Sequence, residues 1–463
     1  MLMASPQWMF ETDLPDDIIS NSLRFNDGDS PYLSKTPSSA GNRRTFTISL
    51  WAKRGDINTS AVLYGAGSAV TDMFQLLMQN DADENRIIVQ NRVSGTNNLN
   101  LVTSAKFGDV SAWYHIVLAV DTTQGTDSNR AKLYVNGTQI TAFNTETYPS
   151  QDYDCHVNNT VAHHIGAQSR GSANDYFDGY IAELYSVDGS ALGPTTFGKT
   201  NTNGVWIPIN ASPTFGTNGF LMEFKQNGGG TNASGRGADT SGNDNHFANN
   251  NFNDYDTTTD TPTNNFCTMN PLGQGGGGST IAEGNLKETT DDNNGCPATF
   301  AVANGKWYWE IKIEAGSNNH IGIGDADFYG QLASNPNSNR ITLYQPDGRV
   351  FNVGSTTQGG DSGRVYDQGD IMAIRLDLDS ATRTIKWYED DTLIATENIG
   401  AAQVLLTPFA GKGGSSQTQN YNFGNPAFSI SSGNSDANGY GNFEYAVPSG
   451  HYALCTKNLA EYG

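Results

Sequence analysis

Short runs of alternating hydrophobic and polar residues recur through the first part of the chain. In residues 45–52 (TFTISLWA), Phe46, Ile48 and Leu50 fall on one side of an extended backbone and the intervening side chains on the other. This two-residue period is typical of a half-buried strand. Similar runs, bounded by clusters of Gly, Asn, Asp or Ser, predict further strands at residues 62–64, 73–78, 87–89, 114–120, 131–135 and 180–187.

The connections between these runs favour tight turns over helices. Asn136 and Gly137 stand between two predicted strands, and such a pair suits a type I′ hairpin turn because both central residues need a positive φ. Helical periodicity is almost absent, and residues 191–199 form the one short helical candidate. We therefore expect an antiparallel β-sandwich.

A second strand-rich block extends from residue 280 to the end of the chain. Its predicted strands lie at residues 306–314, 320–325, 370–379, 384–390 and 405–411. No sequence period links the two blocks, so we expect two separate modules and not a solenoid. The predicted fold class is all-β, with two antiparallel β-sandwich (jelly-roll) domains joined by a connector rich in Asn and Gly.

The expected domain boundaries follow changes in composition. Residues 1–20 form an N-terminal segment, 21–207 the first sandwich, 208–279 the connector and 280–463 the second sandwich. We expect most of the connector to pack on the domains and only residues 275–279 to be loose. Hydrophobic residues are spaced along it like anchors: Phe247, Phe252, Tyr255, Phe266, Met269 and Leu272.

The acidic composition argues against two classes of partner. The 463 residues include 26 Lys and Arg against 48 Asp and Glu, a formal net charge of −22. Contacts with nucleic acid or anionic lipid need clustered basic residues, so we expect no nucleic-acid binding. The apolar runs are far shorter than the roughly 20 residues of a spanning helix, so we expect no membrane insertion. The first residues also lack the features of a secretory signal.

The four cysteines show no metal or redox spacing. Cys155, Cys267, Cys296 and Cys455 are scattered without a C-x-x-C pair. We expect reduced structural thiols, with Cys267 and Cys455 as the one pair that could be bridged.

Sequence strings in both blocks are familiar. The first block contains SLRFNDGDSPYLS, FTISLWAKRG, WYHIVLAVD, LYVNGTQI and FDGYIAELYSVDGSAL in that order. In this respect it resembles the laminin-G-like, concanavalin A-like jelly roll. The second block contains GKWYWEIKIE, GDIMAIRLDLD and TPFAG, and it is similar to a SPRY domain.

Three further strings point to a source for the whole chain. DTSGNDNHFANNNF, TDTPTNNFCTMNPL and PSGHYALCTKNL resemble connectors in structural proteins of tailed phages. The resemblance implies a non-enzymatic virion protein, assembled in the host cytoplasm, which serves as a tail fibre or adhesin and binds host surface glycans. It also implies a homo-oligomer whose residues 1–20 attach to other virion proteins. Two alternatives stay open: a capsid decoration or head-fibre protein, and a polysaccharide depolymerase.

Candidate catalytic groups are few. Glucanases of the jelly-roll class carry carboxylates as E-x-D-x-E on one strand. The nearest string here joins Glu310, Lys312 and Glu314, but a lysine replaces the aspartate, so we expect solvated or rim-facing charges on a half-buried strand. His163 and His164 are adjacent, so in a strand one would face the core and the other solvent. We expect no enzyme activity and no required cofactor.

Calcium is the one metal that the sequence suggests. Asp27 with Asp29, and Asp175 with Asp178, place hard oxygen donors close together. Some laminin-G-like domains bind calcium between such loops. Tight turns use the same residues, however, so an ordinary turn is the alternative.

Carbohydrate binding is the more specific hypothesis for both modules. Sugar sites combine exposed aromatic faces with short polar side chains. Tyr148, Tyr153, Tyr176, Tyr329 and Tyr344 lie among Asn, Asp and Ser residues. We take Tyr153, Tyr176, Tyr329 and Tyr344 as candidate ligand-binding residues, and ordinary packing as the alternative for each.

Overall fold

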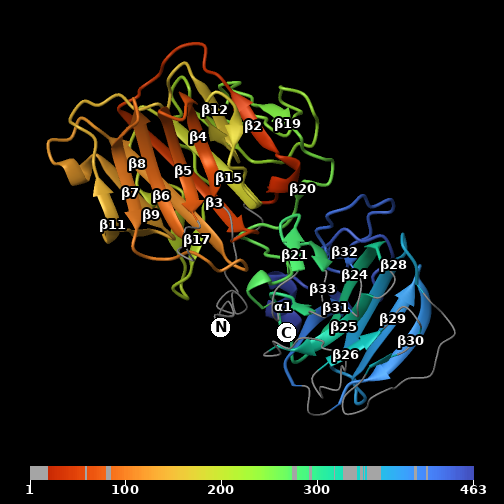
Figure 1. Cartoon of the computed structure of the whole chain (residues 1–463). Coiled ribbons are helices and arrows are strands. Elements are labelled where there is room, and N and C mark those ends of the chain that lie inside the picture. Colours follow the sequence, from red (N-terminus) through yellow and green to blue (C-terminus); the bar gives the residue numbers. More distant parts are fainter. Residues whose placement is uncertain are drawn as a thin grey trace. The chain divides into compact units, whose positions relative to one another are not determined.

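The structure is a computed structural model of the whole chain. It describes residues 19–57, 60–79, 85–273, 279–290, 295–316, 319–326, 341–344, 348, 350–351, 366–400, 404–412 and 416–463. Two compact units are present, and their boundary in the sequence falls between Thr263 and Asn264 (Figure 1). In both units the regular elements are almost all strands, which confirms the predicted all-β class. Most of the predicted N-terminal segment lies outside the described residues.

The first unit contains two eight-stranded antiparallel sheets. The first, here the β3 sheet, has the order β10 (Thr138–Gln139), β9 (Ala131–Val135), β8 (Trp113–Asp121), β3 (Thr45–Arg54), β15 (Gly179–Asp188), β1 (Ser22–Phe25), β20 (Thr257–Thr258), with β18 (Phe220–Met222) also on β15. The second, here the β5 sheet, has the order β11 (Phe143–Thr147), β7 (Thr96–Thr103), β6 (Arg86–Val93), β5 (Asp72–Gln79), β4 (Ala61–Ala69), β12 (Ala162–Ile165), β2 (Tyr32–Lys35), β19 (Ala248–Asn250). Two short hairpins accompany them: β13 (Gln168–Ser169) with β14 (Ala173–Asn174), and β16 (Gly198–Thr200) with β17 (Trp206–Pro208).

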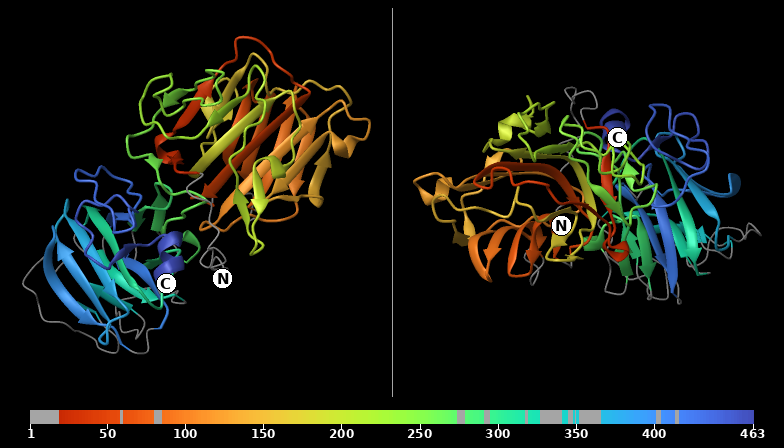
Figure 2. Two further views of the ribbon diagram at one scale, coloured as in Figure 1. Left: turned by 180° about the vertical axis from the view of Figure 1, so that it is seen from behind. Right: turned by 90° about the horizontal axis from the view of Figure 1, so that it is seen from above.

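The predicted alternation builds the core between these sheets. Phe46, Ile48 and Leu50 of β3 point to the same core cluster as Phe74 and Leu76 of β5. The two sheets form two curved layers when viewed from above (Figure 2). The hairpin at Asn136 and Gly137 has φ values of 47° and 78°, as a type I′ turn requires.

The prediction that β3 is half-buried was wrong. Thr47, Ser49 and Trp51, on its second face, are at most 1% exposed. A segment that follows β15 covers this face and brings in Phe197 and Trp206. The alternation of one strand does not reveal a cover supplied by residues far along the chain.

The predicted helix at residues 191–199 is also wrong. Only a 3-10 turn, Pro194–Thr196, forms there. Within the described residues the one α-helix is α1 (Thr456–Tyr462), which packs Leu459 into the second unit. Three further 3-10 turns are Asp27–Asp29, Asp127–Asn129 and Pro271–Gly273.

Residues 208–263 of the predicted connector belong to the first unit. They supply β18 and β20 to the β3 sheet and β19 to the β5 sheet. Phe247 is buried in the core and Phe252 packs against it. Leu272, by contrast, is 54% exposed and is not an anchor.

Two buried ion pairs hold this connector. Arg24 of β1 pairs with Asp256 at 3.2 Å, and Lys53 of β3 pairs with Asp260 at 2.8 Å. In each pair both side chains are at most 8% exposed. Loss of one partner would leave an uncompensated buried charge, which is strongly destabilising.

The second unit also contains two sheets. The larger has the order β21 (Ser279–Ala282), β22 (Lys287–Thr290), β32 (Gln417–Asn422), β24 (Lys306–Ala315), β28 (Ile371–Asp377), β29 (Thr384–Glu389), β30 (Thr392–Asn398), with β33 (Tyr452–Ala453) parallel to β24. The smaller has the order β23 (Gly295–Pro297), β31 (Leu406–Lys412), β25 (Asn319–Asp325), β26 (Ile341–Tyr344), β27 (Val350–Phe351). The core of the second unit contains Trp307, Trp309 and Trp387.

All four cysteines are buried, and none is in a disulfide bond. Phe266 lies opposite Cys455 in an antiparallel bridge. Neighbouring residues of an extended chain point to opposite faces, so Cys267 points away from the face that carries Phe266 and Cys455. The thiols of Cys267 and Cys455 therefore belong to different core clusters. Within the described residues, no helix combines the length and hydropathy needed to cross a bilayer.

Candidate functional site

A row of side-chain amides crosses the outer face of the β5 sheet, the face opposite the core. Gln75 of β5 lies opposite Gln90 of β6, which lies opposite Asn100 of β7. Gln75 Nε2 donates to Gln90 Oε1 at 3.0 Å, and Gln75 Oε1 accepts from Gln168 Nε2 at 2.5 Å. We call Gln168, Gln75, Gln90 and Asn100 the amide row.

Gly65 makes room for one end of this row. A Cβ on Gly65 would lie 2.9 Å from Ala167 O and 2.9 Å from Ser169 N. Strand β13 therefore crosses close above β4 at Gly65, where no side chain intervenes. This crossing places Gln168 beside Gln75.

An aliphatic row runs next to the amide row, two residues away from it on β5, β6 and β7. Val62, Leu77, Ile88 and Val102 occupy matching positions on β4, β5, β6 and β7. They form a small cluster of their own on the outer face. The face thus combines hydrogen-bonding groups with an apolar strip, and Gln75, Gln90 and Gln168 are themselves 5–9% exposed.

Aromatic rings lie at the β12 end of the amide row. His164 Nδ1 donates to Gln168 O at 3.2 Å. The centroid of the Tyr32 ring is 4.8 Å from that of His164 and 6.1 Å from that of Tyr176. Tyr176 is half-buried and its hydroxyl donates to Ala173 O at 3.1 Å. The structure therefore brings the predicted residue Tyr176 to this end of the row.

The amide row carries no formal charge. Burial lowers the pKa of His164, so its imidazole is neutral at pH 7. Among the described residues, Gln168 Oε1 and Asn100 Oδ1 are buried without a hydrogen-bond partner. Buried polar atoms are ordinarily paired, so unpaired ones need an explanation. Such a surface suits neutral hydrogen-bonding ligands and lacks a charged acid or base.

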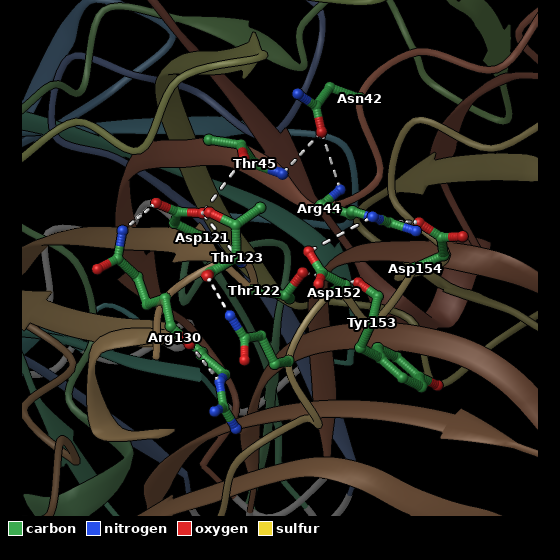
Figure 3. Close-up of polar contacts among 12 residues, drawn as sticks. Asn42, Arg44, Thr45, Asp121, Thr122, Thr123, Arg130, Asp152, Tyr153 and Asp154 are labelled. Carbon is green, nitrogen blue, oxygen red and sulfur yellow. Dashed lines mark hydrogen bonds and ion pairs between the residues drawn. The ribbon is translucent and has the colours of Figure 1, made fainter. Parts of the chain in front are cut away.

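Tyr153 lies on a loop at another place in the first unit. Figure 3 shows how this loop is fixed: Arg44 Nε donates to Asp154 Oδ1 at 2.8 Å, and Asp152 N donates to Thr122 O at 2.9 Å. Thr122 Oγ1 donates to the carbonyl oxygen of Tyr153 at 2.9 Å, and the tyrosine ring points away from the ion pair (Figure 3).

The Tyr153 ring serves packing in this structure. Its hydroxyl accepts from Asn91 Nδ2 at 3.0 Å, and the ring packs against the core of the first unit. Burial raises the pKa of Tyr153 to about 12. Because Asn91 neighbours Gln90 in β6, its side chain faces the core side, so Tyr153 is not part of the amide row.

Of the tyrosines predicted in the second unit, the structure describes Tyr344, which gives no exposed aromatic face. Tyr344 is 0% exposed, and its ring centroid lies 5.7 Å from that of Trp387 and 5.9 Å from that of Tyr366. The prediction that Tyr344 presents a face to a ligand was therefore wrong, because β26 directs it into the core. Tyr329 lies outside the described residues.

The predicted calcium ligands lie on two separate loops, and calcium binding there stays a prediction. Asp27 and Asp29 share a 3-10 turn, and burial together with the nearby Asp56 raises the pKa of Asp27. Asp178 is 2% exposed and accepts from Asp56 N at 3.2 Å, whereas Asp175 is exposed. Among the described residues, no three or more His, Cys, Asp or Glu side chains are arranged to hold a metal ion.

Glu310 was expected to be solvated, and this prediction was wrong. It is 0% exposed, and its carboxyl accepts from Tyr308 Oη at 2.8 Å and Asn422 Nδ2 at 3.1 Å. The backbone N–H groups of Glu444 and Tyr445 also donate to it, at 2.9 and 2.8 Å. Burial raises the pKa of Glu310. Its contacts are those of a structural anchor for the C-terminal segment.

Half of the prediction for the paired histidines was wrong. His163 and His164 are 3% and 7% exposed, so neither faces open solvent. His163 points to the core beside Tyr64, while the β13 crossing covers His164. His164 is buried because β13 lies over the outer face of the β5 sheet, a contact that the sequence of β12 alone does not reveal.

Sequence reasoning missed the amide row. Its local signal is weak but present: Gln75 and Asn100 each stand between two hydrophobic residues, and Gln90 follows the apolar run Ile87–Val89. Gln168 carries no such signal, because only the crossing of β13 over Gly65 brings it to the other three.

Residues 27–195 match a family model described as the concanavalin A-like lectin/glucanases superfamily. This part of the first unit therefore has a lectin-like fold. No protein with a curated description matches the chain.

Several solved structures are similar to parts of the chain. One is the SPRY domain of human HERC1, with 15% identity, coverage of 33% of this chain and 96% of that chain, and a TM-score of 0.28. A second is a heptameric SAP-like pentraxin from Limulus polyphemus, with 17% identity, coverage of 38% and 80%, and a TM-score of 0.30. A third is domain 4 of AbnA, a GH43 extracellular arabinanase from Geobacillus stearothermophilus, in complex with arabinotriose, with 18% identity, coverage of 33% and 65%, and a TM-score of 0.25.

Proposed function

We propose that the first unit binds neutral glycans on the outer face of its β5 sheet. The amide row carries this proposal, because four aligned side-chain amides donate and accept hydrogen bonds as sugar hydroxyl groups require. Two of their oxygens are buried without a partner among the described residues. Tyr32 and Tyr176 add aromatic rings at one end of the row. The lectin-like fold of residues 27–195 supports the same function.

Binding without catalysis is part of the proposal. The amide row and the neighbouring aliphatic row contain no carboxylate, and glycoside hydrolysis ordinarily needs a pair of them. Glu310, the carboxylate that the sequence offered for catalysis, accepts four hydrogen bonds inside the second unit.

For the whole chain we propose a role as a virion protein that carries this site to host surface glycans, as a tail fibre or adhesin. The resemblance of its connecting strings to those of tailed-phage structural proteins supports this role. A homo-oligomer would present several copies of a weak site, and multivalency would then raise the overall affinity.

Binding to a glycan array, followed by titration of the best ligand, tests the site. Gln90→Ala removes the acceptor for Gln75, and we expect at least a tenfold weaker Kd, which is about 1.4 kcal/mol. Gln139→Ala is the matched control, because Gln139 is exposed on β10 of the other sheet. An intact protein that binds no glycan would contradict the function, and equal effects of the two variants would contradict the site.

Imaging of the intact particle by cryo-electron microscopy tests the virion role. Density for this chain at the distal end of a tail appendage is the expected result. Density on the capsid surface would favour decoration of the head, and absence of the chain from purified particles would overturn the virion role.

A further inference from the structure

A buried lysine and a buried aspartate meet where the connector returns to the β3 sheet. Lys53 Nζ lies 2.8 Å from Asp260 Oδ2, and the two side chains are 1% and 0% exposed. The residues are separated by 207 positions in the sequence. Both ions have lost their hydration, so the pair bears a desolvation cost that its mutual attraction must offset.

The surroundings hold both groups in place. Trp113 Nε1 donates to Asp260 Oδ1 at 3.3 Å, and Lys53 Nζ lies 5.4 Å from the centroid of the Tyr180 ring. Trp113 and Tyr180 belong to a buried apolar cluster on the outer face of the β3 sheet. The backbone N–H of Asp260 donates to Thr258 Oγ1 at 3.1 Å. The amine and the carboxyl group are therefore confined together away from water.

We propose that Lys53 and Asp260 condense to an intramolecular isopeptide bond. A proton first passes from the ammonium group to Oδ2, which gives a neutral amine and a carboxylic acid. The nitrogen lone pair attacks Cγ, and the N–Cγ bond forms. Oδ2 then leaves with two protons as water, and the amide keeps one N–H. The step needs no oxidant, reductant or other reactant.

Three features of the site favour this reaction. Confinement at hydrogen-bond distance supplies the proximity that makes intramolecular acyl transfer fast. The Trp113 N–H polarises the carbonyl at Oδ1, where negative charge develops during attack. The product replaces two buried charges by one neutral amide, which removes their desolvation cost.

Other ion pairs of the first unit lack this combination. The neighbouring pair of Arg24 and Asp256 is also buried, but a guanidinium group stays protonated and is no nucleophile. Lys225 pairs with Glu223 at 2.6 Å, yet these side chains are 45% and 27% exposed. Water there stabilises the separate ions.

The bond would lock the connector to the central strand β3. A covalent link between positions 207 residues apart restricts the unfolded chain, as a disulfide of the same span does. A protein with reduced, buried cysteines would thereby gain a cross-link that does not depend on redox conditions.

Intact mass spectrometry of the denatured full-length chain tests the proposal. We expect the mass of the sequence less one water molecule, and a proteolytic peptide in which Lys53 and Asp260 are joined. Lys53→Arg keeps the positive charge but removes the amine, so the mass deficit should disappear. Asp260→Asn should instead lose one ammonia.

The neighbouring ion pair supplies the control. Asp256→Asn alters an equally buried carboxylate and should keep the deficit of one water. A full sequence mass for the folded wild-type chain after prolonged incubation would overturn the proposal. A deficit that persists in Lys53→Arg would overturn the assignment to this residue.

Discussion

The structural role of a buried carboxylate in this protein depends on the hydrogen-bond donors around it. Glu310 has four hydrogen-bond donors directed at its two oxygens, from Tyr308, Asn422 and the backbone of Glu444 and Tyr445. The sequence around it alternates charged and apolar residues and gives no hint of this enclosure. Position in the strand is a local property, whereas three of the four donors come from residues 112–135 positions away.

We predict that Glu310→Gln destabilises the second unit. The amide nitrogen of glutamine would face N–H groups in place of an acceptor, so at least one buried donor would lose its bond. The expected cost is about 1–3 kcal/mol in the free energy of unfolding. Denaturant unfolding at pH 7 measures it.

Glu314→Gln is the control on the same strand. Glu314 pairs with Lys287 at 3.0 Å, and both side chains are about one-third exposed (32% and 34%). A partly exposed pair contributes up to about 1 kcal/mol, so this variant should stay near the wild type. Equal losses of unfolding free energy in the two variants would show that the hydrogen bonds to Glu310 stabilise the unit no more than the partly exposed ion pair of Glu314 does.

At the scale of elements, the crossing of β13 over β4 organises the candidate site. It depends on Gly65, whose missing side chain leaves room for the backbone of Ala167 and Ser169. The crossing aligns Gln168 with Gln75 and brings the backbone of Gln168 to His164. One glycine thus links packing to the proposed binding surface.

We predict that Gly65→Ala displaces β13. A Cβ 2.9 Å from backbone atoms forces a shift that costs about 1–3 kcal/mol. The Tm of the first unit should fall by about 2–4 °C for each kcal/mol, and affinity for glycan should fall with it. Thermal unfolding and glycan titration on the same samples measure both effects.

Gly193→Ala is the matched control for this change. A Cβ on Gly193 meets nothing within 4 Å, and its φ of −80° suits alanine. The Tm and the affinity should stay within error of the wild type. A Gly65→Ala variant that behaves in the same way would contradict the role of the crossing.

At the scale of the whole molecule, the first unit extends to Thr263, beyond the end of the sandwich expected from composition. The Asn- and Gly-rich segment supplies three strands and the counterions Asp256 and Asp260. Its composition resembles a linker because turns and short strands use the same polar residues.

We predict that a chain of residues 19–263 folds, whereas one of residues 19–207 does not. The shorter chain leaves Arg24 and Lys53 buried without their carboxylates. Each broken pair costs about 3–5 kcal/mol, against a typical total stability of about 5–15 kcal/mol. Circular dichroism and limited proteolysis compare the two chains, and equal melting curves would contradict the prediction.

The sequence alone determined the all-β class, the approximate positions of the strands and the turn at Asn136 and Gly137. These properties are local, because the period of two residues and a positive φ act over a few neighbouring residues. The family resemblance to a lectin-like jelly roll likewise rested on the order of such local strings.

Only the tertiary structure decided which faces are covered and which side chains meet. The second face of β3, the burial of Tyr344 and Glu310, and the amide row all depend on residues brought together from distant positions. The meeting of Lys53 with Asp260 is the clearest case, since 207 positions separate them. Hydrophobic period is a property of one strand, but burial and hydrogen bonding depend on what the rest of the chain places against it.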